Sequence, residues 1–166
     1  RDMTQKELRD KLGYVPQKGV LFSGTIDSNI RYGKPEITDA QVKEAAEVAQ
    51  ATEFIDTKPE KYKSPVSQGG TNVSGGQKQR LSIARAIVKD PEIFIFDDSF
   101  SALDFKTDSQ LRKALKEYTK DATTVIVAQR ISTILGADQI IVLDDGHMAG
   151  IGTHKELMAK IGRAHV

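Results

Sequence analysis

Apolar residues recur with a helical period over residues 81–88, three or four positions apart, with basic residues on the opposite face. The apolar members are Leu81, Ala84, Ile87 and Val88. Ser74 followed three residues later by Gln77 is a capping-box pattern, so we expect a helix to begin directly after Ser74. We expect it to end at Asp90, because the proline that follows cannot continue a helix.

The short apolar run Ile93–Phe96 follows this helix and predicts a strand that is covered on both faces. In open parallel sheets the ligand crevice lies beyond the carboxyl ends of the strands, where Asp97 and Asp98 fall. A carboxylate there can hold Mg²⁺, directly or through water. Gly75 and Gly76 leave the first NH groups of the preceding helix uncovered, and such a helix end attracts phosphate. This stretch therefore suits nucleotide chemistry.

The rest of the chain alternates between strand and helix patterns. We expect strands at residues 12–15 and 123–128, helices within residues 39–57, an amphipathic helix around Leu111 and Leu115, a hairpin over residues 140–151 that turns at Asp145-Gly146, and a last helix at residues 154–161. Such alternation predicts an α/β fold.

Composition narrows the function classes. The 166 residues are 39% hydrophobic and 28% charged, which is typical of one soluble globular unit or part of one. Twenty-four Lys and Arg against 23 Asp and Glu give a net charge of +1, which argues against a nucleic-acid-binding surface. There are no cysteines, so thiolate metal sites are excluded. No apolar run approaches the roughly 20 residues of a membrane span.

Three motifs in order make the chain resemble the nucleotide-binding domain of an ABC transporter. VSGGQ (residues 73–77) resembles the family's signature motif, IFIFDD (93–98) its Walker B strand, and SALD (101–104) its D-loop. Pro16-Gln17, after the strand at 12–15, resembles the Q-loop, and the run VLFSGTIDSNIRYG (20–33) resembles exporter-type members. The resemblance implies a P-loop NTPase core with a mostly parallel sheet and a helical subdomain.

On this resemblance we expect one partial nucleotide-binding domain over residues 1–166. It comprises the Q-loop region at 1–35, the helical subdomain with the signature at 36–90, the rest of the core at 91–160, and a possible non-native tail at 161–166. The phosphate-binding pattern G-x-x-x-x-G-K-[ST] does not occur in the sequence, and in the family it lies upstream of the Q-loop. We therefore expect the chain by itself to bind ATP poorly and to be inactive.

The family's site residues transfer to matching positions. The resemblance implies ATP and Mg²⁺ as cofactors, with Asp97 holding Mg²⁺ and Gln17 reaching both the metal and the attacking water. In the family two domains meet head to tail, and each signature completes the site of the other. Asp104 would contact that second domain. The signature residues here are Ser74, Gly75, Gly76 and Gln77.

Two positions depart from the family pattern. Asp98 stands where a catalytic glutamate is usual, and its carboxylate would sit roughly 1.5 Å short of a water positioned for glutamate. Gln129, within VIVAQR, stands where a switch histidine is usual, and an amide cannot carry imidazolium charge. Both changes predict weak hydrolysis at this chain's own site, as in the degenerate half of a heterodimeric exporter whose signature serves the partner's site.

The expected parent is an exporter that couples ATP hydrolysis to substrate export, with its transmembrane domain in the same polypeptide and its nucleotide-binding domains on the cytoplasmic face of the cell membrane. Two alternatives stay open. One is a soluble ABC ATPase of DNA repair or chromosome structure, which shares the signature and Walker B. The other is a non-catalytic interaction module. Sequence upstream of residue 1 would discriminate among them.

Overall fold

The computed structural model describes residues 2–161, and the chain divides into two compact units at the bond between Val127 and Ala128. Of the predicted tail at 161–166, all but the backbone of Ile161 lies outside the described residues.

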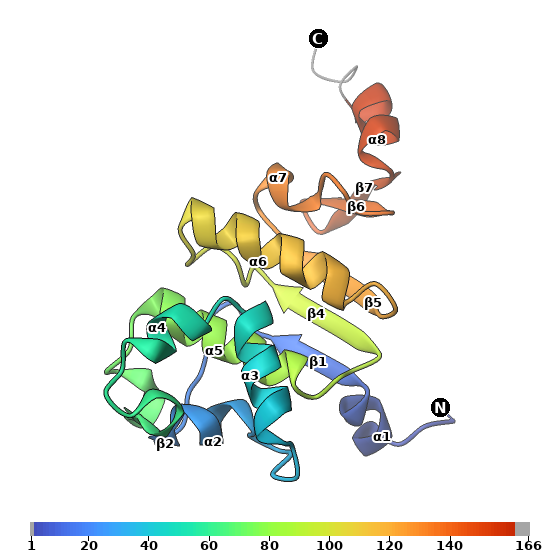
Figure 1. Cartoon of the computed structure of the whole chain (residues 1–166). Coiled ribbons are helices and arrows are strands. Elements are labelled where there is room, and N and C mark those ends of the chain that lie inside the picture. The colour runs from blue at the N-terminus through green and yellow to red at the C-terminus, as the bar shows by residue number, and fades with distance from the viewer. Residues whose placement is uncertain (1, 162–166) are drawn as a thin grey trace. The chain divides into compact units, whose positions relative to one another are not determined.

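A three-stranded parallel sheet organises the first unit (Figure 1). Its strands are β1 (Leu12–Val15), β4 (Ile93–Asp97) and β5 (Thr123–Val127), in the order β1-β4-β5. In the register Val15 lies beside Phe96, which lies beside Ile126. The predicted strands and the parallel sheet are therefore confirmed, and the carboxyl ends of all three strands meet at one edge.

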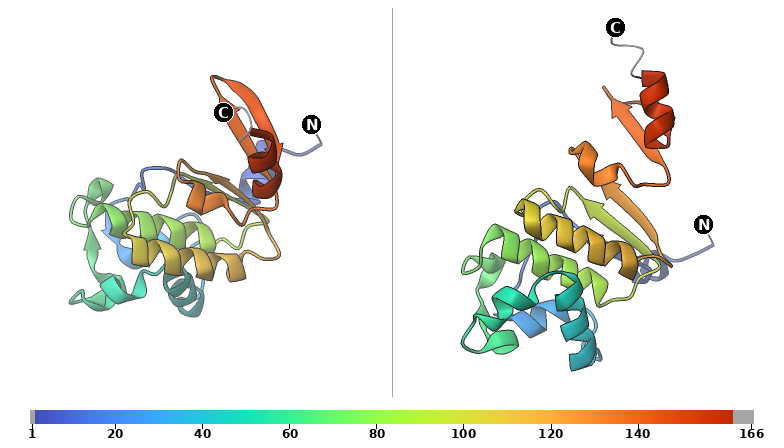
Figure 2. Two further views of the ribbon diagram at one scale, coloured as in Figure 1. Left: turned by 90° about the horizontal axis from the view of Figure 1, so that it is seen from above. Right: turned by 45° about the horizontal axis from the view of Figure 1, so that its top comes forward.

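The two faces of this sheet differ. Val15, Phe94 and Phe96 are buried in one hydrophobic cluster with residues of α5 (Gly75–Ile87) and α6 (Phe105–Tyr118), which lie on the same side of the sheet in Figure 2. On the opposite face Tyr14 is 54% exposed and Val125 is 47% exposed. Within β4 itself Ile93 and Ile95 on that face are half-buried, so the strand at 93–96 is fully covered on one face only and the expectation of cover on both faces is not met in the described chain. An uninterrupted apolar run gives no period that could reveal a half-open face.

Helix α5 begins where its sequence predicts. The side chain of Ser74 accepts a hydrogen bond from the backbone of Gln77, whose side chain accepts one from the backbone of Ser74. The helix ends at Ile87 rather than at Asp90, because Asp90 adopts a left-handed conformation with φ of 48°. A turn before the proline, rather than the proline itself, therefore ends the helix.

Shorter elements complete the first unit, and of these α2 and α3 pack against α5. The predicted helices in 39–57 are two, separated by Gln50 in a left-handed conformation. The short elements are α1 (Gln5–Asp10), β2 (Gly24–Thr25), α2 (Ile26–Ile30), α3 (Asp39–Val48), α4 (Thr52–Asp56), the 3₁₀ helices η1 (Lys61–Lys63) and η2 (Gln68–Gly70), and β3 (Pro65–Val66), which pairs with β2.

The second unit contains α7 (Ile131–Ile134), the antiparallel hairpin of β6 (Ile140–Asp144) and β7 (His147–Gly152), and α8 (His154–Ile161). Asp145 and Gly146 both have positive φ, 48° and 79°, as the tight turn between two strands requires. The predicted hairpin and last helix are confirmed.

Candidate functional site

Four polar side chains form two hydrogen-bonded pairs near the carboxyl ends of β1 and β4. The hydroxyl of Tyr14 donates to Oδ2 of Asp97 over 3.2 Å, and Nε2 of Gln17 donates to Oδ2 of Asp98 over 3.1 Å. Each pair joins residues more than 80 positions apart, because the parallel register places Val15 beside Phe96. Gln17 therefore lies at the same sheet edge as the two carboxylates, as its position after the strand at 12–15 led us to expect.

The backbone turns sharply at Asp98. Its φ is 45°, in the left-handed region that aspartate tolerates better than most side chains. The amide of Asp98 donates to the carbonyl of Val127 at 2.9 Å, and the hydroxyl of Ser101 donates to the carbonyl of Asp98 at 3.0 Å. The buried Ser99 donates to the carbonyl of Val15 at 2.8 Å. These bonds hold the turn to both neighbouring strands and orient the carboxylate of Asp98 toward Gln17.

Tyr14 is the residue of this cluster that the sequence reasoning missed. Partial burial, followed by the hydrogen bond to Asp97, raises the pKa of Tyr14 above its ordinary value of 10.0. The phenol is therefore protonated at neutral pH and donates to the carboxylate. The strand pattern carried a signal, since the neighbour of a buried residue on a strand points to the opposite face of the sheet. It did not show which residue Tyr14 would meet on that face.

The donor set fits Mg²⁺. Mg²⁺ prefers hard oxygen ligands, and it is usually held by one or two carboxylates together with waters and substrate phosphates. Asp97 and Asp98 supply carboxylates, and Gln17 supplies an amide oxygen, because its nitrogen faces Asp98. Among residues 2–161 no group of three or more acidic or histidine side chains gathers into a metal site. A metal ion here would thus need further oxygen ligands from water or from a bound substrate.

The signature residues form a second feature at the start of α5. Gly75 faces open space, because a side-chain carbon added there would have no atom within 4 Å. A carbon added at Gly76 would lie 3.4 Å from the carbonyl oxygen of Ala102. The first turn thus presents NH groups without covering side chains, as an anion-binding helix end requires. No hydrogen bond within residues 2–161 joins this end to Asp97 or Asp98, so the two features are separate.

Asp104 caps α6. Its carboxylate accepts hydrogen bonds from the backbone amide of Thr107 at 3.0 Å and from the hydroxyl of Thr107 at 2.7 Å. The backbone bond, and then the hydroxyl bond, lower the pKa of Asp104 below its ordinary value of 3.8. The carboxylate is ionised and fixed in orientation at neutral pH.

Gln129 belongs to the second unit, where it is exposed and precedes α7. Its predicted role at the switch position stays a prediction. No described helix is long and apolar enough to cross a membrane.

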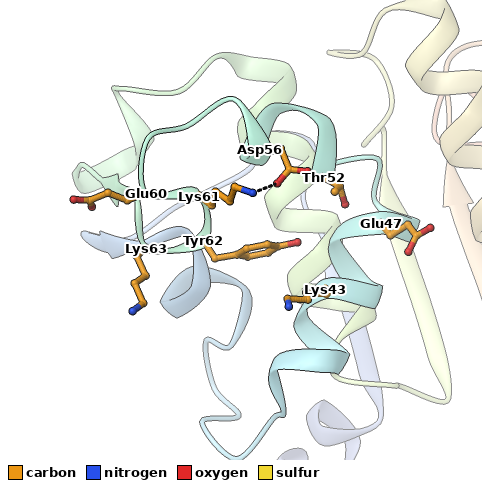
Figure 3. A pocket seen from close by; sticks show the side chains of 8 residues that line it. All are labelled: Lys43, Glu47, Thr52, Asp56, Glu60, Lys61, Tyr62 and Lys63. Atoms are coloured by element: carbon orange, nitrogen blue, oxygen red, sulfur yellow. Dashed lines mark ion pairs between the residues drawn. The ribbon is translucent and has the colours of Figure 1, made fainter.

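A hollow of about 500 Å³ lies elsewhere in the first unit, between α3, α4 and η1 (Figure 3). Its lining mixes cations and anions, and Lys61 and Asp56 approach each other at 3.5 Å across it. The lining residues are Lys43, Glu47, Thr52, Asp56, Glu60, Lys61, Tyr62 and Lys63. Opposite charges that neutralise one another give this hollow no preference for a polyanion, so it is not the candidate nucleotide site.

Comparisons with known proteins agree on one family. The family described as ABC transporter matches residues 1–101. Two putative multidrug export ATP-binding/permease proteins of Staphylococcus aureus, from strains NCTC 8325 and COL, are each 47% identical to the chain over 162 residues, which is 98% of this chain and 28% of the relative. The chain therefore spans about a quarter of the length of these relatives.

A solved structure is also similar. The structure of a bacterial Atm1-family ABC exporter with ATP bound superposes with a TM-score of 0.92 and is 42% identical, covering 95% of this chain and 28% of that one. The paired carboxylates after β4 and the capped glycines of α5 thus lie on a backbone that is shared with an exporter.

Proposed function

Because this chain belongs to the ABC transporter family, we propose that it is part of the nucleotide-binding domain of an exporter that couples ATP binding and hydrolysis to substrate export. The observation that carries the proposal is the meeting of Gln17, Asp97 and Asp98 at one edge of a parallel sheet, with a capped Gly75-Gly76 helix start in the same unit. The relatives named above combine ATP-binding and permease parts, which supports a transmembrane domain as partner.

In this proposal each side chain has a task. Asp97, oriented by Tyr14, binds Mg²⁺, which when bound would neutralise charge on the phosphates. Gln17 orients the attacking water, and Asp98 accepts its proton. A side chain one methylene shorter than glutamate misplaces that proton acceptor, and a misplacement of about 1 Å can cost on the order of 100-fold in rate. The chain's own site is therefore slow.

The signature would serve a second nucleotide-binding domain instead. The hydroxyl of Ser74 and the bare amides of Gly75 and Gly76 offer donors to the γ-phosphate of a nucleotide held by that domain, and Gln77 closes the capping box that orients Ser74. Asp104 would contact the same partner. The proposed assembly is a heterodimer with one working site, on the cytoplasmic face of the membrane.

The test is the ATPase activity of the assembled transporter. Replacing the partner's catalytic glutamate should reduce hydrolysis to near background, because this chain's site contributes little. In that background the double variant Asp98→Glu with Gln129→His should restore turnover by about 10-fold or more, which is part of the roughly 100- to 10,000-fold that general-base help supplies. The exposed Asp121→Glu is the matched control and should restore none. Near-normal hydrolysis after loss of the partner's glutamate would contradict the proposal.

A second variant separates the signature from the chain's own site. Gly75→Asp places a carboxylate where phosphate would bind, in a position with room for a side chain. It should reduce hydrolysis at the partner's site by about 100-fold or more through charge repulsion, while a negative charge at a helix N-terminus leaves the fold intact. Unchanged hydrolysis would show that α5 does not meet the partner's nucleotide.

A further inference from the structure

The loop that carries Gln17 is attached to α5 on both sides of that residue. Nε2 of Gln79 donates to the carbonyl of Pro16 over 3.0 Å, and the amide of Gly19 donates to Oε1 of Gln79 over 2.9 Å. The side-chain amide of Gln79 thus donates to the backbone just before Gln17 and accepts from the backbone just after it. None of the motifs identified in the sequence includes Gln79.

Burial makes this attachment firm. Gln79 is only 2% exposed, so replacing its amide would leave the carbonyl of Pro16 and the amide of Gly19 without their partner in a place with little water. The loop also comes close to the helix backbone. A side-chain carbon at Gly19 would lie 2.6 Å from Oγ of Ser82 and 3.0 Å from the carbonyl of Lys78. The loop is therefore seated directly on α5.

The loop also reaches the candidate hydrolytic site. Gln17 lies between the two attachment points and donates to Asp98. Gln79 itself lies within the first two turns of α5, close in sequence to the signature residues Ser74 and Gln77 at the start of the same helix. The loop that carries Gln17 is thus joined to the first turns of α5 by the two hydrogen bonds of Gln79 and by the close approach of Gly19 to the helix.

We propose that Gln79 is a positioning residue that makes Gln17 follow the signature end of α5. Nucleotide bound at that end, in the site of a second domain, would then shift Gln17 against Asp98 in this chain's own site. The response to nucleotide rests on the function proposed above. The attachment of the loop does not, and the two can be tested separately.

Backbone hydrogen exchange in the purified protein tests the attachment. Gln79→Met keeps the length and volume of the side chain without its hydrogen bonds. We expect exchange of the Gly19 amide to accelerate about 10-fold or more, as for loss of one ordinary hydrogen bond. Amides within α5, such as that of Ile83, should change by less than about twofold. The control Gln110→Met makes the same change at an exposed position of α6 and should leave Gly19 unchanged.

Gln79→Glu is the second variant, should Gln79→Met fail to fold. Glutamate retains the acceptor for Gly19 but loses the donor for Pro16, so Gly19 should stay protected while the side-chain amide resonances of Gln17 shift. Gly19 exchange that is unchanged in Gln79→Met, or Gln17 resonances that are unmoved in Gln79→Glu, would overturn the attachment role.

The coupling is measured from the side-chain amide of Gln17 when ATP and the partner domain are added. In the unmodified protein its resonance should move, and in Gln79→Met the movement should fall at least about fivefold. If light scattering shows complex formation while the Gln17 resonance stays unmoved, the coupling is overturned and the proposed function stands. If no complex forms with ATP, the proposed function fails, and the exchange result still decides the attachment.

Discussion

Replacing Arg85 tests what holds α5 to the elements around it. Its guanidinium donates three hydrogen bonds, to the carbonyl of Asn29 at 2.8 Å, to Oδ1 of Asn29 at 2.9 Å and to the carbonyl of Val20 at 2.8 Å. It also lies over the stacked rings of Phe22 and Tyr32, 5.4 and 5.5 Å from their centroids. Burial lowers the pKa of Arg85 below its ordinary value, and an arginine side chain nevertheless stays charged in proteins.

The magnitude follows from these contacts. Hydrogen bonds to a charged group are each worth about 1.5–3 kcal/mol, and neighbouring bonds are not additive. Arg85→Met keeps the aliphatic packing but leaves the acceptors of the buried Asn29 without this donor. We expect the free energy of unfolding to fall by about 3–5 kcal/mol, a large share of the roughly 5–15 kcal/mol of a typical domain.

Urea unfolding followed by circular dichroism measures this change. The control is Arg9→Met on the exposed face of α1, where the guanidinium reaches Gln5 only at 3.4 Å. That variant should stay within about 0.5 kcal/mol of the unmodified protein. The free energy of unfolding of Arg85→Lys should lie between those of Arg85→Met and the unmodified protein, because a lysine has the charge without the planar set of donors. A loss below about 1 kcal/mol for Arg85→Met would refute the reasoning.

Two further predictions concern packing and pH. Gly13→Ala should lower the free energy of unfolding by about 1–3 kcal/mol, because the new carbon would lie 2.6 Å from Cγ of Pro91. Gly75→Ala is the control and should leave the free energy of unfolding unchanged, because the space around Gly75 is open. Denaturant titration of both variants measures the difference, and equal losses would contradict the prediction. Because hydrogen bonds from Thr107 lower the pKa of Asp104 in the folded chain, this carboxylate stabilises the fold above its unfolded pKa and stops doing so as pH falls through the lowered value. The melting temperature of Asp104→Asn should therefore fall less than that of the unmodified protein when the pH is lowered from neutral to below 3.8. Equal falls in the two melting temperatures would contradict the prediction.

Several elements of the fold could be predicted from residues that are close together in the sequence. The capping pair Ser74–Gln77 and the Asp145-Gly146 turn each depend on residues within a few positions, and the structure has both. The Arg85–Asn29 and Gln79–Gly19 bonds join residues 56 and 60 positions apart. Periodicity shows that such a residue lies on the packed face of a helix, but not which partner it meets, so these contacts could not be predicted from one sequence.

The departure at position 98 looks different once its surroundings are known. Considered alone, Asp98 is a carboxylate one methylene too short for its task. In the structure that carboxylate already has a partner, Gln17, which is in turn held from α5 through Gln79. A glutamate at position 98 would extend roughly 1.5 Å further, so either the bond to Gln17 breaks or the loop that carries Gln17 moves. The turnover expected from Asp98→Glu with Gln129→His therefore comes with a change at Gln17, and the activity of this site depends on Gln17 and residue 98 together rather than on the carboxylate alone.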